Sequence, residues 1–497
     1  MRRSSLLCVL VLASGCLGQR AFACDADEQC LQSAAGVCEA DQWCSYPSDA
    51  CDSGRAYGPH APDGVAGSCV KPVVAEGSTG DGDGADDGDE SGSDGTPVPR
   101  CGDGTVDPGE DCDDGNRLPG DGCHPQCVEP GTPAWTATFD GDAHGEDRGF
   151  GLAVDAAADA IYVAGLSAGA DTERDIMIQR WRLATGELQW TRVIDGGALA
   201  EDIGEHVAVD SAGNVVVVGM LTTEATGPDA WVAKYNPQGD QLWVETFDRS
   251  GLADKAAGVA IGDGDRIIAV GHSEDETRTD AWMQWYTTDG VAEGPAIYRG
   301  EAGFSEAIDV IADGDEFQVT GSLRLSTDEQ VVWTARYAAD GSNVWEHQLT
   351  NADVGNAPRG VGQDFDPLGG SAIAGVVSND LLLQRYDDAG VPTTSLAEDG
   401  PQGSHDEAAD VAFSSDGTFV VVGFLDFSTT GFATSDSIVR RHEADGTLIW
   451  GDRFEGEAAE IDKALGVEVT QDLSAVVVGY ETVPGQSRDV WLRRYAL

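Results

Sequence analysis

Basic residues are scarce in this sequence. Lys and Arg together number 29 against 88 Asp and Glu, and the formal net charge is −59 at pH 7. A surface of this sign repels polyanions, so the composition argues against DNA or RNA as a partner. It leaves cationic partners and divalent ions open, and it keeps an exported chain soluble.

Long apolar runs are also lacking, apart from one short run near the N-terminus. Residues 6–13 are apolar and follow Arg2 and Arg3, which is the arrangement of a secretory signal peptide. The run is too short to cross a bilayer as a helix. The sequence therefore predicts export and no transmembrane helix.

The segment LASGC at residues 12–16 has small residues before a cysteine, as a variant lipobox does. This predicts a lipoprotein-type signal peptide over residues 1–15, with lipidation at Cys16. Leu17 follows, where Asp would retain a lipoprotein at the inner membrane, so we expect the outer membrane. The alternative is cleavage after Ala23, which would leave a secreted protein without an anchor.

Cysteine is absent after Cys127. Ten cysteines besides the lipidation candidate Cys16 remain after either cleavage, and an even number in an exported chain predicts disulfide bonds. They are Cys24, Cys30, Cys38, Cys44, Cys51, Cys69, Cys101, Cys112, Cys123 and Cys127. They define two modules, residues 16–70 and 101–128, each too small to bury much core. Metal binding by the CHPQC segment at 123–127 is the less favoured alternative.

Residues 71–100 join the two modules and are rich in Gly, Ser and Asp, with eight acidic residues inside the stretch. Such a composition buries too little apolar surface to fold, which predicts a disordered, acidic linker. Asp81 does not begin a calcium loop, because Ala85 and Asp86 occupy the fifth ligand position and the glycine position.

A strand ending in glycine recurs seven times at a spacing of about 50 residues, which is typical of a circular or solenoid array. The glycines are Gly165, Gly219, Gly271, Gly321, Gly375, Gly423 and Gly479. Each repeat divides into four strands, as at 207–209, 215–219, 229–235 and 241–247 in the second. We therefore predict an all-β fold in which residues 134–497 form a seven-bladed β-propeller of four-stranded blades, preceded by two small disulfide-rich modules.

The two ends of the array predict ring closure. The chain finishes on a third strand at 489–495 and lacks a fourth, whereas residues 134–139 form a fourth strand without a repeat before it. Together they would complete one blade and remove a free sheet edge.

The repeat phrases VAVDSAGNVVVVG at 207–219 and DAWVAKYNPQGDQLW at 229–243 resemble the bacterial SBBP-type β-propeller repeat family. Residues 101–127 resemble the cysteine-rich repeat of myxobacterial surface proteins. Together the resemblances imply a myxobacterial-type surface lipoprotein with a propeller. They imply little about a reaction, because one fold serves many functions.

A side-chain oxygen recurs just ahead of each first strand. The residues are Asp147, Asp202, Asp254, Ser305, Asn356, Asp406 and Asp462. Because Ser and Asn keep the oxygen but lose the charge, we interpret the series as structural turn caps that accept backbone N–H groups. The alternative is a ring of ligands for Ca²⁺; otherwise we expect no metal and no cofactor.

No H-E-x-x-H or Walker-type motif is present. The G-x-S-x-G pattern at 165–169 lies at a repeat glycine rather than at a strand-to-helix turn, and His442 fills a position that is aromatic in the other repeats, so both are interpreted as structural. Isolated polar residues inside strands are Asp309, Gln363, Asp364 and Glu468. The sequence thus predicts no catalytic residues, although convergence of three or more polar side chains in one pocket would favour an enzyme.

We therefore expect an exported, membrane-tethered, monomeric protein whose propeller is a non-enzymatic scaffold for a protein, glycan or matrix partner. The alternative is a propeller hydrolase or lyase with a carboxylate-based site at the channel mouth. The irregular loops expected to contribute to binding are 140–147, 222–229, 350–359, 398–407 and 426–436.

Overall fold

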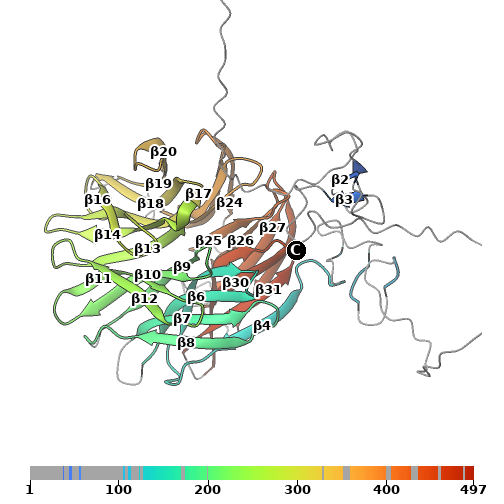
Figure 1. Ribbon diagram of the computed structural model, residues 1–497, viewed down its shortest axis with the longest axis horizontal. Helices are drawn as coiled ribbons and strands as arrows, with labels where there is room; N and C mark the ends of the chain where they lie inside the picture. Colours follow the sequence, from blue (N-terminus) through green and yellow to red (C-terminus); the bar gives the residue numbers. More distant parts are fainter. Residues whose placement is uncertain are drawn as a thin grey trace, which may run out of the picture. The chain divides into compact units, whose positions relative to one another are not determined.

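The computed structural model describes residues 37–38, 44–47, 55–57, 104–106, 110–113, 123, 127–169, 174–198, 200–326, 329–350, 359–398, 405–426, 435–456, 460–484 and 487–497 (Figure 1). The chain divides into two compact units, residues 1–95 and 96–497. In the first unit, β1 (Val37–Cys38), β2 (Cys44–Pro47) and β3 (Arg55–Tyr57) form an antiparallel sheet in that order. No helix in the described part of the chain is long and apolar enough to cross a membrane.

Seven four-stranded antiparallel sheets form the second unit, as predicted. Blade 1 contains β5 (Arg148–Asp155), β6 (Ala160–Ser167), β7 (Asp175–Arg182) and β8 (Leu188–Ile194). Blade 2 contains β9 (Ile203–Val209), β10 (Val215–Thr223), β11 (Gly227–Tyr235) and β12 (Gln241–Phe247). Blade 3 contains β13 (Asp254–Ile261), β14 (Ile267–Glu274), β15 (Thr279–Tyr286) and β16 (Ala292–Arg299). Blade 4 contains β17 (Glu306–Asp313), β18 (Glu316–Ser326), β19 (Glu329–Tyr337) and β20 (Asn343–Thr350).

The remaining blades follow the same order. Blade 5 contains β21 (Arg359–Phe365), β22 (Ser371–Val377), β23 (Asp380–Tyr386) and β24 (Pro392–Glu398). Blade 6 contains β25 (Glu407–Phe413), β26 (Phe419–Asp426), β27 (Ser435–His442) and β28 (Leu448–Phe454). Blade 7 contains β29 (Lys463–Val469), β30 (Ser474–Thr482), β31 (Arg488–Ala496) and β4 (Pro133–Phe139).

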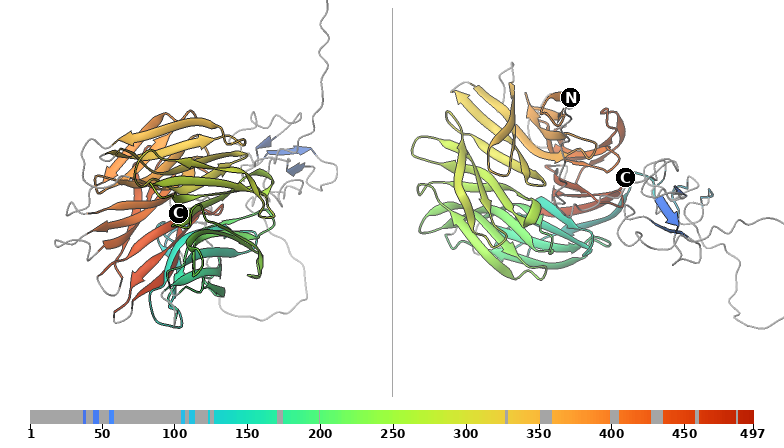
Figure 2. Two further views of the ribbon diagram at one scale, coloured as in Figure 1. Left: turned by 90° about the vertical axis from the view of Figure 1, so that its left-hand side faces the viewer. Right: turned by 45° about the horizontal axis from the view of Figure 1, so that its top comes forward.

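The ring closes between the two ends of the array, as predicted. Strand β4 pairs antiparallel with β31, with Val490 opposite Phe139 and Trp491 opposite Thr138. In Figure 2 the teal strand from the start of the array lies beside the red strands from its end. The first and last strands of the propeller, β4 and β31, therefore belong to one blade, and their pairing covers the edge of β31 that would otherwise be free.

The strands of a blade differ in burial, and their sequences differ accordingly. The second strand of blade 2 begins with four consecutive valines, Val215–Val218, all buried, because neighbouring blades cover both of its faces. The fourth strand of the same blade is mostly exposed, with only Trp243 and Phe247 half-buried. Apolar clusters lie between blades: Tyr162 and Ile178 of blade 1 pack with Trp231 of blade 2.

The repeated glycine has a steric cause. A Cβ atom on Gly219 would lie 1.9 Å from the carbonyl oxygen of Ile203 on the adjacent first strand. The other six repeat glycines have the same close backbone approach, at 1.9–2.2 Å. The pairing register shifts directly after this contact, so that the first strand bulges by one residue. The first strand of blade 2 was predicted to start at Val207. It starts at Ile203 instead, because the pairing extends past the bulge.

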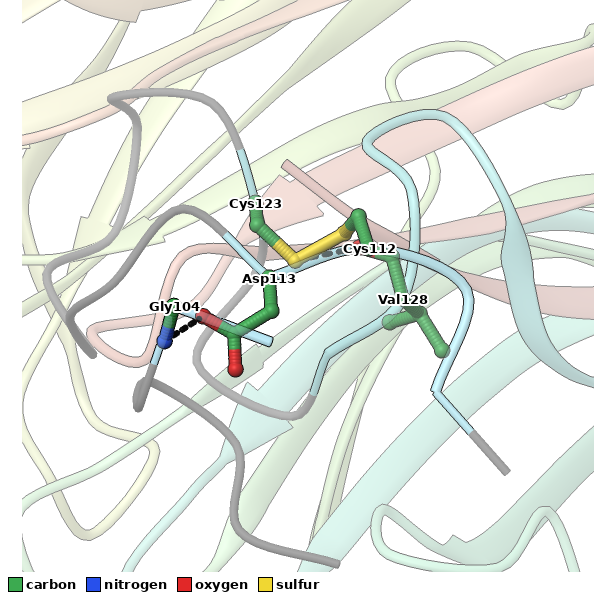
Figure 3. The surroundings of a disulfide bond; sticks show 5 residues. All are labelled: Gly104, Cys112, Asp113, Cys123 and Val128. Atoms are coloured by element: carbon green, nitrogen blue, oxygen red, sulfur yellow. Dashed lines mark hydrogen bonds between the residues drawn. A yellow bond between two sulfur atoms is a disulfide. The ribbon is translucent and has the colours of Figure 1, made fainter. Parts of the chain in front are cut away.

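The second cysteine-rich module belongs to the second unit and is described in part. Cys112 and Cys123 form a disulfide bond, and Cys127 is also disulfide-bonded (Figure 3). The N–H of Gly104 donates to Asp113 at 2.9 Å in the same module. These bonds confirm cross-linking at three of the predicted cysteines and leave no thiolate at Cys123 or Cys127 for a metal.

Candidate functional site

The seven first strands surround a central channel. Where these strands begin, the channel widens into a cavity of about 380 Å³, lined by residues of every first strand. The bulge turns one residue of each first strand toward the channel, and six of these seven are apolar. The seven residues, of which Glu205 is the charged one, are Phe150, Glu205, Ala257, Ile308, Val361, Ala409 and Leu465. The end of the channel that holds this cavity is called the mouth below.

Charged side chains at the mouth alternate in sign from blade to blade. In blade order they are Arg148, Glu205, Lys255, Glu306, Arg359, Glu407 and Lys463. Two pairs of opposite neighbours contact directly: Lys255 Nζ lies 2.5 Å from Glu205 Oε1, and Arg359 Nη2 lies 2.9 Å from Glu407 Oε1. Pairing of this kind offsets the cost of burying charge.

The pKa values follow the pairing. Burial opposes the charge on Glu407, but its hydrogen bond with His405 and the nearby Arg359 guanidinium hold its pKa below the ordinary value. Burial likewise opposes the charge on Lys255, and the Glu205 carboxylate raises its pKa. The mouth therefore keeps these groups ionised at neutral pH.

An odd number of blades leaves one pair of like charges. Lys463 of blade 7 and Arg148 of blade 1 are neighbours in the ring, and no carboxylate of the ring lies between them. Burial, opposed by Glu407 and reinforced by Arg359, Arg488 and Arg148, lowers the pKa of Lys463 to about 8. Within the described residues Lys463 Nζ forms no ion pair; it lies 3.5 Å from the centre of the Phe424 ring.

Further positive charge surrounds this position. Arg148, Arg174 and Arg488 all contact one carboxylate, that of Glu146, with Arg488 Nη1 at 2.6 Å and Arg174 Nη1 at 2.9 Å. Arg174 is shared with one more carboxylate, Glu201. Several cationic side chains thus gather near the mouth between blades 7 and 1, in a protein that is otherwise strongly acidic.

Deeper in the channel, small and large residues alternate at the position after the bulge. The series is Gly151, His206, Gly258, Asp309, Gly362, Asp410 and Gly466. A Cβ on Gly362 would lie 2.4 Å from Asp410 Oδ1, and one on Gly151 would lie 2.9 Å from His206. Each large side chain therefore occupies space that the preceding glycine leaves free.

Four acidic residues converge on a second cavity of about 360 Å³ inside the channel: Asp309, Asp364, Asp410 and Glu468. Backbone N–H groups of the next first strand donate to three of them. Phe413 N–H donates to Asp364 at 2.8 Å, Val467 N–H to Asp410 at 2.9 Å, and Val154 N–H to Glu468 at 2.8 Å. The acids thereby satisfy backbone donors that face the channel.

These interior acids have no basic partner in the part of the chain that the structure describes, and burial raises their pKa values. Burial raises the pKa of Asp364 to about 6, of Asp410 to about 7 and of Glu468 to about 8. Burial and then the neighbouring Asp410 raise the pKa of Asp309 well above its usual value. Burial also lowers the pKa of His206 to about 4, so this ring is neutral near pH 7 and supplies no positive charge.

The four polar residues that the sequence singled out inside strands line one cavity, together with Asp410, which it did not single out. Gln363 bridges blades 4 and 5: its Nε2 donates to the carbonyl oxygens of Asp309 and Gln318 at 2.9 and 3.0 Å. Sequence reasoning missed Asp410. The available signal was the shared phrase E-A-x-D-V at 306–310 and 407–411, which places Asp309 and Asp410 at equivalent positions.

The predicted cap residues occupy one structural position at the junctions between blades. Asp202 accepts hydrogen bonds from the N–H groups of Gly196 and Thr222 at 2.6 and 2.5 Å, and Asp462 accepts from Gly456 and Thr482 at 2.5 and 2.8 Å. The other described members also accept backbone N–H groups, namely Asp147, Asp254, Ser305 and Asp406. Asn356 lies outside the described residues.

The remaining predicted positions are structural or lie outside the described part. Ser167 of the G-x-S-x-G pattern is buried within β6, and the ring of His442 stacks on Phe419 with centroids 5.3 Å apart. Cys16, the linker 71–100 and five of the predicted disulfide cysteines lie outside the described residues; these cysteines are Cys24, Cys30, Cys51, Cys69 and Cys101. Cys38 and Cys44 are described as members of strands, without their side chains. Of the irregular loops, 140–147 and 222–229 are described in full.

One family model matches the cysteine-rich region of this chain. Residues 93–128 match a domain of unknown function, DUF4215, which includes the second cysteine-rich module. No curated protein is detectably similar to this chain in sequence.

Among solved structures, a Lactobacillus plantarum protein is similar at 15% identity and a TM-score of 0.43, over 66% of this chain and 92% of that one. Sqt1 of Chaetomium thermophilum, solved with the N-terminus of ribosomal protein L10, is similar at 14% identity and a TM-score of 0.43. That match covers 74% of this chain and all of Sqt1. The polysaccharide lyase Uly1 is similar at 10% identity and a TM-score of 0.45, over 70% and 90% of the two chains.

Proposed function

We propose that this protein is a surface binding protein whose propeller holds a small acidic sugar at the channel mouth, between blades 7 and 1. The observation that carries the proposal is the adjacent pair of cations, Lys463 and Arg148, in a ring whose other neighbours alternate in sign. A carboxylate placed between them would complete the alternation. A ligand with a single carboxylate fits better than a polyanion, because the net charge of −59 repels the latter.

The size and position of the cavity support the same class of ligand. A volume of about 380 Å³ falls in the usual range of small-molecule sites. The mouth lies at the end of the first strands where loops 140–147 and 222–229 emerge, which are loops expected from the sequence to bind. Tyr480 lines the mouth beside Arg148, whose guanidinium carbon is 5.1 Å from the ring centre.

Export and tethering remain part of the proposal, carried by the signal-peptide pattern and Cys16. An SBBP-type, myxobacterial-type lipoprotein would present the propeller at the outer membrane as a monomer; secretion after cleavage at Ala23 is the alternative. Labelling with palmitate in the producing cell tests this, because Cys16→Ser abolishes incorporation only if Cys16 is the lipidated residue.

Calorimetric titration tests the binding proposal. We expect a glucuronate-containing disaccharide to bind and its neutral glucose counterpart not to bind. Lys463→Gln should weaken binding at least about tenfold, the effect of losing one charge-assisted hydrogen bond. Arg299→Gln, which removes the same charge from a fourth strand away from the mouth, is the matched control. Equal effects of the two substitutions, or no binding of the acidic sugar, would contradict the proposal.

A second function is favoured by one observation. Four acids converge on one cavity, and the pKa values of Asp410 and Glu468 lie near 7 and 8, as those of general acids often do. This meets the condition that the sequence argument set for a carboxylate-based hydrolase or lyase. The backbone N–H donors on three of the acids give them a structural role, and on that ground we rank the enzyme second. Release of reducing ends from acidic polysaccharides, lost in Asp410→Asn, would reverse the ranking.

A further inference from the structure

Outside the channel, the junctions between blades bring three acidic positions together. One is at the start of a third strand, one directly follows the fourth strand of the same blade, and one is the cap residue ahead of the next blade. At the junction of blades 7 and 1 these are Asp489, Asp140 and Asp147. One ligand oxygen from each lies within 4.8 Å of the other two.

Burial and missing partners distinguish this trio from an ordinary acidic surface. Asp147 is 0% exposed and Asp489 is 6% exposed. Asp147 Oδ2 accepts from the N–H of Gly141 at 2.8 Å, and Asp140 Oδ2 lies 2.6 Å from His144 Nδ1. Among the residues that the structure describes, Oδ1 of Asp489 and Oδ1 of Asp140 are buried and have no hydrogen-bond partner. A buried carboxylate oxygen without a partner is energetically unfavourable, and a bound cation would remove this cost.

Equivalent positions in other blades show how the chain itself supplies such a cation. Asp280, at the start of the third strand in blade 3, is bound by Arg249 Nη1 at 3.0 Å and by Arg278 Nε at 2.8 Å. Asp436 in blade 6 is paired with Arg453. Asp489 has no guanidinium partner within the described residues, and the neighbouring Arg488 contacts Glu146 instead.

Two other compact groups lack this combination. In the group of Asp175, Asp195 and Asp202, both oxygens of Asp202 already accept backbone N–H groups. In the group of Glu110, Asp113 and Cys127, the cysteine is disulfide-bonded and offers no thiolate. The junction of blades 7 and 1 is therefore the stronger candidate.

We propose that Asp140, Asp147 and Asp489 bind one divalent cation of the Ca²⁺ type. Ca²⁺ takes oxygen ligands at about 2.4 Å, so its ligands lie at most about 4.8 Å apart, and the three oxygens of this trio lie within that distance of one another. Mg²⁺ demands shorter, octahedral contacts and gives up its waters reluctantly, so it fits this preformed set less well.

A cation at this site would also link the start of the propeller to its end. Asp140 and Asp147 belong to the segment between β4 and β5 at the start of the propeller, whereas Asp489 belongs to β31 at its end. An ion held by all three binds only the closed ring and so stabilises the folded state.

Calcium-dependent thermal unfolding of the full chain tests this proposal. We expect Ca²⁺ to raise the melting temperature and Mg²⁺ to raise it less. Asp489→Asn keeps the shape of the side chain but removes a ligand charge, so it should weaken Ca²⁺ binding at least about tenfold and abolish most of the rise.

Asp280→Asn is the matched control, because its carboxylate already has two arginine partners. The calcium-dependent rise should persist in this variant even if its baseline stability falls. A calorimetric titration should find one fewer tight Ca²⁺ site in Asp489→Asn than in the unaltered chain. No effect of Ca²⁺ on the unaltered chain, or the same rise and stoichiometry in Asp489→Asn, would overturn the proposal.

Discussion

Two acidic residues of one first strand, one at the mouth of the channel and one in its interior, have pKa values shifted in opposite directions. Glu407 and Asp410 lie three residues apart on β25. Arginine and histidine partners hold the pKa of Glu407 below its ordinary value, whereas burial with only backbone donors raises the pKa of Asp410 to about 7. The partner supplied by the neighbouring blade therefore decides the charge state of a channel carboxylate, more than its residue type does.

Packing of the interior gives the largest expected effect. Gly362→Ala places a Cβ 2.4 Å from Asp410 Oδ1 and 2.7 Å from the Ala409 carbonyl oxygen, and we expect a loss of about 3 kcal/mol in the free energy of unfolding. Gly466→Ala is the matched control, since its nearest neighbour, Phe150 O, lies at 3.2 Å and the loss should be about 1 kcal/mol or less. Chemical denaturation of both variants measures the difference, and similar losses would refute the alternating packing.

The cap series predicts a smaller but selective effect at the blade junctions. Asp202→Ala leaves the N–H groups of Gly196 and Thr222 without an acceptor and should cost about 2 kcal/mol of stability. Asp202→Asn keeps an accepting oxygen and should leave stability nearly intact. Thermal unfolding of the two variants checks this; an equal loss in both would contradict capping.

The interior acids predict that stability depends on pH. Because their pKa values are raised in the folded state, the folded protein binds protons more tightly than the unfolded chain does. The free energy of unfolding should therefore fall as pH rises from about 4 to about 8. Glu468→Gln should flatten the slope and gain on the order of 1 kcal/mol at about pH 8. Urea unfolding across this range measures it, and stability that stays level in the unaltered chain would argue against buried, uncompensated acids.

Mouth substitutions should affect stability least. Among the described residues Lys463 forms no ion pair, so Lys463→Gln should change the free energy of unfolding by about 0.5 kcal/mol or less while it weakens ligand binding. The same thermal and calorimetric assays record both values. A large stability loss with unchanged binding would make Lys463 a structural residue and remove it from the site.

Much of the fold could be predicted from the sequence, because each blade repeats its own local signals. The repeat glycines fix the close approach of the first two strands, and the isolated strand at 134–139 finds its partner in β31. The bulge after each repeat glycine was not predicted, since it follows from pairing between strands rather than from residue type. That bulge shifts Glu205 into register with the mouth charges of the other blades.

The site itself was only partly predictable. Asp309, Asp364 and Glu468 stand out as polar residues inside strands, but their convergence depends on which blades face one another across the channel. The alternating ring of charges was missed for the same reason: neighbours in the ring are about 50 residues apart in the chain. Likewise, Asp489 looks like an ordinary recurring residue in the sequence. The structure distinguishes it, because Asp280 and Asp436 have arginine partners that Asp489 lacks among the described residues.

A crystal structure of the full chain with the glucuronate-containing disaccharide tests the central claim most directly. The account predicts that the ligand carboxylate lies between Lys463 and Arg148, in the cavity at the channel mouth. A ligand bound at the interior acids around Asp410 and Glu468, or on the opposite face of the propeller, would contradict it.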